Sequence, residues 1–388
     1  MWQELIGQEL AVKSLKQAAK EALQNANGNN SSGFSQSWLI TGPPGSGRST
    51  AAKLFAAALE CEKSGCGECS TCKSVLNGTH PDVKTILPTG TTYVVEDVKQ
   101  LIQSSALIPA VGQWNIFILE DADRLTTVAA NALLKSIEEP ARNTMWILLA
   151  PSSQDVISTI RSRCRMINLR MPPFDEIAEL LTTRDGVDPA MAKFSAAAAL
   201  GHVGRAKLLA LDENLREVRR QILQLPFELS DLPSCFKAAA QLFDTTSAEA
   251  DRENEELDKL EQDQLLESYG AGALGLSKTK IQKMSSSAMK DLAKDQKARN
   301  KRIARDRLDL ALVEIAAFYR DVLVVQSGAK LELFHEEHRG SIEKMAQSST
   351  IDSTIKRLEA VEEARGLLPS EAAPLLVLEA MMIQLARA

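Results

Sequence analysis

The sequence predicts an α/β domain, a parallel sheet with helices on both faces, followed by wholly helical domains. Two observations support this. Apolar segments of strand length alternate with helical segments between Ser37 and Leu169, as in parallel sheets. From Glu213 onward, apolar residues recur every three or four positions, for example Leu308, Leu312 and Ile315. That spacing is typical of helices, so we expect no strand in this part of the chain.

The expected elements of the α/β domain follow one another closely. The five apolar segments interpreted as strands begin at Ser37, Val83, Trp114, Met145 and Arg165. Helices are expected at residues 51–59, 94–107 and 128–138, the last of them ending before Pro140. We also expect a short helical segment within residues 2–15 and a surface loop at residues 25–36, which are rich in Asn, Ser and Gly.

A glycine-rich turn follows the first strand and opens a helix. It has the spacing G-x-x-x-x-G-[K]-[ST] of a phosphate-binding loop, with arginine in the lysine position. Backbone N–H groups of such a loop surround phosphate oxygens, and a serine hydroxyl can bind Mg²⁺. A turn without ligand is the less favoured interpretation. The candidate nucleotide-binding residues are Gly42, Pro43, Gly45, Ser46, Gly47, Arg48, Ser49 and Thr50.

Two adjacent carboxylates, Glu120 and Asp121, follow the buried strand WNIFIL. In phosphate-loop proteins, a carboxylate at this place holds Mg²⁺, and a second one polarises the attacking water. Here the order is Glu then Asp, the reverse of the usual order. Both groups would therefore be displaced by more than about 1 Å from the positions that hydrolysis requires. The alternative is a solvated loop without a role in nucleotide binding.

Four of the six cysteines form a compact C-x4-C-x2-C-x2-C module: Cys61, Cys66, Cys69 and Cys72. In a cytosolic chain such clustering favours a metal over disulfides, and four thiolates suit tetrahedral Zn²⁺. An iron–sulfur cluster or a redox pair is the alternative. A zinc ion with four protein ligands has no open position for substrate, so we expect a structural role.

The chain after the predicted sheet divides at Pro172-Pro173. Residues 174–211 are short, alanine-rich helical segments. Within the helical region that follows, residues 249–267 are strongly acidic and residues 278–307 strongly basic, with SYGAGALGLS at the turn. This charged insertion, about 249–307, is either a charge-paired helical hairpin or a disordered segment. Its basic arm could contact DNA, but a solvated structural insert is the favoured interpretation.

Composition restricts the class of protein. The 388 residues carry a formal net charge of −6, so any contact with nucleic acid requires a local basic patch. No apolar run approaches the roughly 20 residues of a membrane span, and the amino terminus lacks the pattern of a signal peptide. We therefore expect a cytoplasmic protein without membrane contact.

Several of these motifs occur together, and in this order, in one family. The amino-terminal W-x-x-L-I-G-Q-E, the GPPGSGRST loop, the cysteine module, EDADRLTTVAANALLKSIEEP and Ser162-Arg163-Cys164 resemble those of bacterial clamp-loader ATPases of the DNA polymerase III holoenzyme. The resemblance is dense over residues 1–210. It implies an AAA+ nucleotide-binding domain at residues 1–171, a helical lid at 172–212 and a helical collar for oligomerisation at 213–388.

The resemblance also implies roles for individual residues. In the family, the arginine of the Ser-Arg-Cys motif completes the ATP site of a neighbouring subunit, which maps onto Arg163. Pairing with a local carboxylate is the alternative for Arg163. Arg205 matches the arginine of the lid that reaches back to nucleotide. With Arg48 in place of lysine and the carboxylates reversed, we expect weak or absent binding of ATP and Mg²⁺ and little hydrolysis in this chain.

The family further implies partners and a place in replication. The expected partners are tau/gamma and delta subunits in a hetero-pentameric ring, the beta sliding clamp, and primed DNA held through its phosphates. The departures from the motor pattern favour a fixed stator subunit that acts on a neighbour's ATP site. An active motor ATPase, or a zinc-bearing AAA+ scaffold outside replication, are the alternatives.

Overall fold

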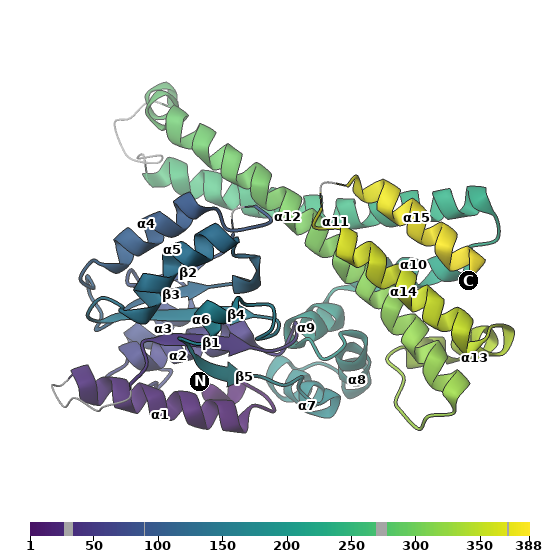
Figure 1. Ribbon diagram of the computed structural model, residues 1–388, viewed down its shortest axis with the longest axis horizontal. Helices are drawn as coiled ribbons and strands as arrows, with labels where there is room; N and C mark the ends of the chain where they lie inside the picture. Colours follow the sequence, from purple (N-terminus) through teal and green to yellow (C-terminus); the bar gives the residue numbers. More distant parts are fainter. Residues whose placement is uncertain (27–33, 89, 269–277, 371) are drawn as a thin grey trace. The chain divides into compact units, whose positions relative to one another are not determined.

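The computed structural model describes residues 1–26, 34–88, 90–268, 278–370 and 372–388. The chain divides into two compact units, residues 1–88 with 92–211, and residues 89–91 with 212–388 (Figure 1). The first unit contains the sheet and the short helices that follow it. The second contains helices and no strand among its described residues. None of the described helices combines the length and the apolar content needed to cross a membrane.

A five-stranded parallel sheet forms the centre of the first unit. The strands are β1 (Ser37–Thr41), β2 (Val83–Ile86), β3 (Asn115–Leu119), β4 (Thr144–Ala150) and β5 (Arg165–Asn168). They lie in the order β2-β3-β4-β1-β5. β1, β3 and β4 are buried along their whole length, which explains their nearly continuous apolar sequences. All five expected strands are present, and the α/β prediction is confirmed.

Helices cover both faces of this sheet. On one face, Trp38, Ile40 and Ile147 pack in one core with α1 (Glu9–Ala26), α2 (Arg48–Glu60) and α3 (Ser70–Leu76). On the other face, the alternate residues Leu39 and Phe117 pack with three further helices (Figure 1). These helices are α4 (Val95–Ser105), α5 (Thr127–Glu138) and α6 (Ser158–Arg161).

The amino-terminal region differs from the sequence-based expectation. A single 3-10 turn, η1 (Trp2–Glu4), precedes α1, which runs for 18 residues rather than forming a short segment. Its buried residues Leu15, Ala18, Ala19 and Ala22 follow helical spacing. Alanine side chains form much of the buried face of α1 and give a weak apolar pattern in the sequence, so the expected helix was shorter than the observed one. Of the predicted loop at 25–36, residues 25 and 26 belong to α1 and residues 27–33 lie outside the described residues.

Three short helices follow the sheet: α7 (Phe174–Asp185), α8 (Pro189–Ala198) and α9 (Val203–Leu211). They begin directly after Pro172-Pro173, where the sequence indicated a boundary. The carboxylate of Asp188 caps α8 by accepting the N–H groups of Ala190 and Met191 at 3.0 and 3.2 Å. The expected short helices after the sheet are present, but they belong to the same compact unit as the sheet, so a separate lid domain at residues 172–212 stays a prediction.

The second unit is built from long helices around its own core. They are α10 (Glu213–Gln224), α11 (Leu232–Ser268), α12 (Lys278–Ser327), α13 (Arg339–Ser348), α14 (Ile351–Leu367) and α15 (Pro374–Arg387). Leu312, Ile315 and Val322 of α12 are fully buried against Val361 of α14 and Leu378 of α15. The period of three and four residues along α12 thus corresponds to its buried face.

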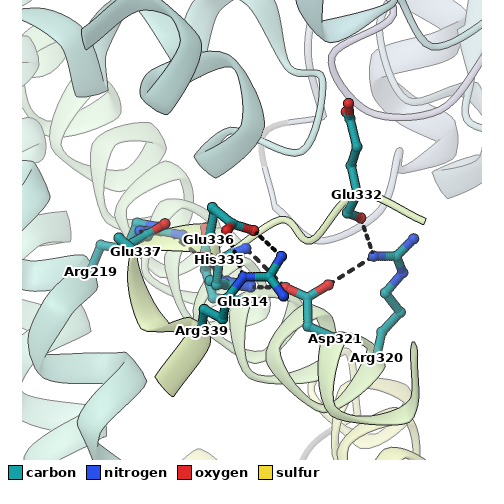
Figure 2. Close-up of polar contacts among 9 residues, drawn as sticks. All are labelled: Arg219, Glu314, Arg320, Asp321, Glu332, His335, Glu336, Glu337 and Arg339. Atoms are coloured by element: carbon teal, nitrogen blue, oxygen red, sulfur yellow. Dashed lines mark hydrogen bonds and ion pairs between the residues drawn. The ribbon is translucent and has the colours of Figure 1, made fainter. Parts of the chain in front are cut away.

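A buried ionic network links distant parts of this second unit (Figure 2). The guanidinium of Arg219 on α10 contacts Glu314 at 3.2 Å and Glu337 at 2.6 Å. His335 lies between the carboxylates of Asp321, 2.8 Å from Nδ1, and Glu314, 3.3 Å from Nε2. Burial lowers the pKa of His335, but its bonds to both carboxylates outweigh this and raise the pKa above its usual value. Each buried charge in this set therefore has an opposite charge beside it.

The charged insertion forms a helical hairpin over its described residues. Arg299 of α12 pairs with Asp258 and Glu261 of α11. About two turns further along α12, Arg307 pairs with Glu249 at 3.1 Å and Glu253 at 2.5 Å. Of the two alternatives raised by the sequence, the charge-paired hairpin is therefore correct for residues 249–268 and 278–307. The remainder of the predicted turn, residues 269–277, lies outside the described residues.

Candidate nucleotide-binding and arginine sites

The glycine-rich turn connects β1 to α2 in the first unit. Gly45 and Gly47 have φ angles of +86° and +89°, which non-glycine residues rarely adopt. A Cβ on Gly45 would overlap the backbone and ring of His202 at the start of α9. Glycine at positions 45 and 47 therefore allows the positive φ angles of the loop. Glycine at position 45 also allows the loop to lie directly against His202.

A cavity of about 390 Å³ lies along this loop. Its walls come from the amino terminus, from the loop and from the lid, including Ile6, Gly47, Thr50, Pro172 and His202. The lid arginine lining the cavity is Arg184, whereas Arg205 is not among the lining residues. The amide of Arg205 instead donates to Nδ1 of His202 at 3.2 Å. The structure thus brings the phosphate loop and the lid together around a space of nucleotide-site size.

Ser49, the expected Mg²⁺ ligand, is engaged within the protein. Its hydroxyl donates to Oε2 of Glu120 at 2.8 Å. Burial raises the pKa of Glu120, and the nearby charge of Asp121 adds to this, whereas Ser49 and Arg48 oppose it. The Glu120 side chain thus binds the serine hydroxyl that would be the ligand of Mg²⁺.

Asp121 points in a different direction. Its backbone is in the left-handed region, with φ of +48°, and its carboxylate lies 3.6 Å from the guanidinium of Arg124. The hydroxyl of Tyr93 fixes the preceding strand end by donating to the carbonyls of Ile86 and Glu120 at 2.8 and 2.6 Å. Neither Glu120 nor Asp121 lines the cavity beside the phosphate loop. The two carboxylates are adjacent in the sequence, but their side chains have different partners: Glu120 contacts Ser49, and Asp121 lies beside Arg124.

Arg48, which replaces the usual lysine, lies at the start of α2. One of its guanidinium nitrogens, Nη1, is buried and has no hydrogen-bond partner among the described residues. Its charge contributes to lowering the pKa of His202, after burial and the charge of Arg205. A neutral His202 agrees with Nδ1 acting as the acceptor for the Arg205 amide. Arg48 is therefore a half-buried cation that lines the cavity and has one buried donor without a partner among the described residues.

Three contributors to this region were not identified from the sequence. The side chain of Gln8 donates to the Arg170 carbonyl at 2.6 Å and accepts from the Arg170 amide at 3.1 Å. His202 packs on Gly45. Asp123 has a buried oxygen without a partner among the described residues, and burial raises its pKa. Gln8 belonged to the quoted W-x-x-L-I-G-Q-E motif, so a signal was present for it. Asp123 likewise lies in the quoted EDADRLTTVAANALLKSIEEP stretch, whereas nothing in the sequence indicated that His202 packs on the loop.

Arg163 lies in the turn between α6 and β5, and its side chain is 35% exposed. Its Nε donates to Oε2 of Glu138 at 2.9 Å, and Nη1 donates to the carbonyl of Thr159 at 3.1 Å. The neighbouring Arg161 donates to the Ser153 carbonyl at 2.9 Å, and Arg165 stacks 4.8 Å from the Trp38 ring. The local carboxylate pairing considered for Arg163 is thus present, with a carboxylate that is itself 55% exposed.

The four cysteines of the module converge. Their sulfur atoms all lie within 4.8 Å of one another, and Cys61 is 3.7 Å from Cys66 and 3.8 Å from Cys69. Four sulfurs around a tetrahedral zinc ion, each bound at about 2.3 Å, would be separated by about 3.8 Å. Hydrogen bonds from the amides of Glu68 and Cys69 lower the pKa of Cys66 to about 6. The module therefore fits a zinc ion without rearrangement.

Residues 15–173 match the family model described as DNA polymerase III, delta subunit. The DNA polymerase III subunit delta' of Bacillus subtilis is 30% identical over 195 residues, which are 50% of this chain and 59% of that protein. The subunit tau of the same organism is 31% identical over 173 residues, 44% of this chain and 29% of that protein.

A solved structure of a DNA polymerase III gamma subunit-related protein from Thermotoga maritima aligns with 97% of this chain and 98% of that one. The sequence identity is 14% and the TM-score 0.44. The chain spans less than two thirds of the length of the Bacillus relatives.

Proposed function

We propose that the chain is a member of the DNA polymerase III clamp-loader family and that within this family it serves as a delta prime subunit, which the family match and the similarity to delta' of Bacillus subtilis support. In this role it is a stator. It supplies Arg163 to the ATP site of a neighbouring tau/gamma subunit and has little ATPase activity of its own. It acts in the cytoplasm, in a ring with tau/gamma and delta that places the beta sliding clamp on primed DNA.

The observation that carries the proposal is the contact between Ser49 and Glu120. In an active phosphate-loop ATPase the serine hydroxyl is available to Mg²⁺, and one carboxylate polarises water. Here Glu120 holds the serine at 2.8 Å and Asp121 lies beside Arg124. Gly42, Pro43, Gly45, Ser46, Gly47, Arg48, Ser49 and Thr50 would hold the phosphates of a bound ATP. The groups needed for hydrolysis are not assembled around them.

Arg163 has the position that a trans-acting arginine requires. It lies in a surface turn, and its local partner is an exposed carboxylate, whose attraction is weak in water. Exchange of Glu138 for a neighbour's γ-phosphate would therefore cost little. A guanidinium at that phosphate offsets the charge that develops during transfer. Arg161 and Arg165 bind within their own domain and are poorer candidates.

The cysteine module would hold a structural zinc ion. Cys61, Cys66, Cys69 and Cys72 supply four thiolates at the required separations. Cys61 and Cys72 are buried among residues of the core that includes α2. Zinc would therefore join the end of α2 to α3 without taking part in chemistry.

Intrinsic hydrolysis distinguishes this proposal from an active motor. We expect the purified chain to hydrolyse ATP no faster than its Arg48→Ala variant. The reason is that Ser49 is bound by Glu120 and Asp121 lies beside Arg124, so neither a metal ligand nor a carboxylate that polarises water is in place. Hydrolysis is measured by phosphate release, with and without primed DNA. Turnover at the rate of a tau/gamma subunit, abolished by Arg48→Ala, would assign the chain to the motor class. Failure to co-purify with tau/gamma would favour a scaffold outside replication.

A further inference from the structure

A row of lysines follows one side of α12 within the hairpin. Lys290, Lys294, Lys297 and Lys301 are spaced by four, three and four residues, and all four side chains are exposed. At about 100° per residue they fall within an arc of about 60°, and at 1.5 Å per residue they extend over about 16 Å. We call these four residues the lysine row. Arg305, four residues further on, continues it.

The lysine row lies on the side of α12 that the acidic helix does not neutralise. Arg299 and Arg307 face α11 and pair with its carboxylates. Around the helix, Arg299 lies about 140° and Arg307 about 80° from the nearest lysine of the row. No ion pair to a lysine of the row is found among the described residues. Two cations of α12 therefore bind the hairpin together, while the lysines remain available to a partner.

Two carboxylates of α11 lie close to two of the four lysines, and one of them already has other partners. Asp251 and Asp258 of α11 share with Lys297 and Lys301 a groove of about 410 Å³. Of the two, Asp258 is already bound by Arg299 and by the Asn300 amide. Asp295 and Asp306 of α12 lie more than about 80° from every lysine of the row. The local charge along the row is therefore positive although the chain carries a net charge of −6.

We propose that the lysine row binds the sugar–phosphate backbone of duplex nucleic acid without reading its sequence. Ammonium groups act as point charges for phosphates, and a row of about 16 Å extends past about five phosphates of one strand. No aromatic residue occurs in residues 278–307, so the surface lacks the stacking platforms that single strands use. The inference does not depend on the stator role, since it concerns only the hairpin.

Replacement of the four lysines by glutamine tests this. The full-length chain is titrated into a fluorescent 30-base-pair duplex at several salt concentrations, and binding is followed by anisotropy. We expect at least about a tenfold loss of affinity. The slope of log affinity against log salt should become shallower by about 3 to 4, because each lost phosphate contact removes about 0.9. The corresponding Lys→Arg variant keeps the charge and should retain binding.

The matched control replaces four exposed lysines elsewhere in the second unit, Lys237, Lys259, Lys344 and Lys356, by glutamine. It makes the same change in net charge and should bind the duplex as the unaltered chain does. Equal losses in both variants would overturn the proposal, as would unaltered binding by the row variant or no duplex binding by the chain itself. Tighter binding of a single strand, or equal competition by polyglutamate, would also overturn it.

Discussion

The side chain of Glu120 is one methylene group longer than the aspartate that usually follows the corresponding strand in phosphate-loop proteins. Glutamate at position 120 reaches the serine hydroxyl of the phosphate loop, and the aspartate that follows turns toward Arg124. Arg48 adds a planar guanidinium where a phosphate-binding loop usually carries the compact ammonium of lysine. Gly45 and Gly47 keep positive φ angles, and we propose that binding and hydrolysis of nucleotide are separable in this chain.

Nucleotide affinity should respond to position 48. Lysine at this position places a point charge between phosphates, so we expect Arg48→Lys to bind MgADP about tenfold more tightly than the unaltered chain. Arg48→Ala, which removes the charge, should bind more weakly. Isothermal titration calorimetry measures both. Equal affinities in all three proteins would mean that Arg48 does not face bound phosphate.

Glu60 provides a second test at the residue scale. Burial raises its pKa from 4.5 to about 7, although its oxygens accept the amides of Gln113 and Trp114. The folded chain therefore binds a proton that the unfolded chain has lost. This contribution to stability is complete below pH 4.5 and is lost as the pH rises to about 7, a change of about 3 kcal/mol.

We expect the Glu60→Gln variant to lose most of this pH dependence. Urea denaturation at pH 5 and pH 8, followed by tryptophan fluorescence, measures it. All four tryptophans, Trp2, Trp38, Trp114 and Trp146, lie in the first unit, so the signal reports that unit alone. His80, whose pKa burial lowers, titrates in both proteins, and the difference between them isolates Glu60. The same pH slope in both would contradict the assignment.

At the scale of elements, the cysteine module determines how α2 continues into α3. A zinc ion there would be part of the folding free energy of this segment. We expect about one zinc per chain by elemental analysis, and we expect Cys72→Ser to lower both the zinc content and the melting temperature. Cys164→Ser, outside the module, is the control and should retain the metal. Iron, or no metal, in the unaltered protein would refute the zinc assignment.

Two neighbouring arginines of the second unit differ in burial, because only the first of them belongs to the buried ionic network. Arg219 is 4% exposed and lies between Glu314 and Glu337 (Figure 2). Arg220 is 61% exposed and pairs with Glu217 on the surface. Removing Arg219 takes away one of the two cationic partners of the buried Glu314 and leaves His335 as the other, so Arg219→Ala should destabilise this unit by about 3–5 kcal/mol.

The matched Arg220→Ala variant should cost no more than about 1 kcal/mol. Far-ultraviolet circular dichroism during urea denaturation follows the helices of both units. Tryptophan fluorescence reports the first unit alone, since the second contains no tryptophan, and the difference between the two transitions assigns the loss to the second unit. Comparable losses in the two variants would show that the buried pairs contribute no more than an exposed one.

At the scale of the whole chain, sequence patterns predicted the sheet and the phosphate loop well because their signals are local. An apolar strand followed by glycines and a helix needs no distant contact to be recognised. The convergence of the cysteines was also expected, since a segment of twelve residues contains all four. What the sequence could not reveal were contacts between distant residues. The Ser49–Glu120 bond spans 71 positions, and the contact of His202 with Gly45 depends on the lid.

The charged insertion illustrates the same limit. Alternating acidic and basic runs suit a paired hairpin and a disordered segment equally well. Only the register of Arg299 with Asp258 and Glu261 distinguishes them. On α12, Arg299 and Arg307 pair with α11, whereas the lysine row forms no ion pair among the described residues. This difference follows from the register of the two helices and could not be derived from composition.

The central claim is that Arg163 acts on a neighbouring subunit. It is tested most directly by ATP hydrolysis in a mixture with tau/gamma, delta, the clamp and primed DNA, comparing Arg163→Ala with Glu138→Ala. We predict that Arg163→Ala lowers the stimulated rate at least about tenfold while the ring still assembles, and that Glu138→Ala leaves the rate unchanged. If Arg163 serves only its local ion pair, the two variants will behave alike, and an unchanged rate in both would contradict the stator account.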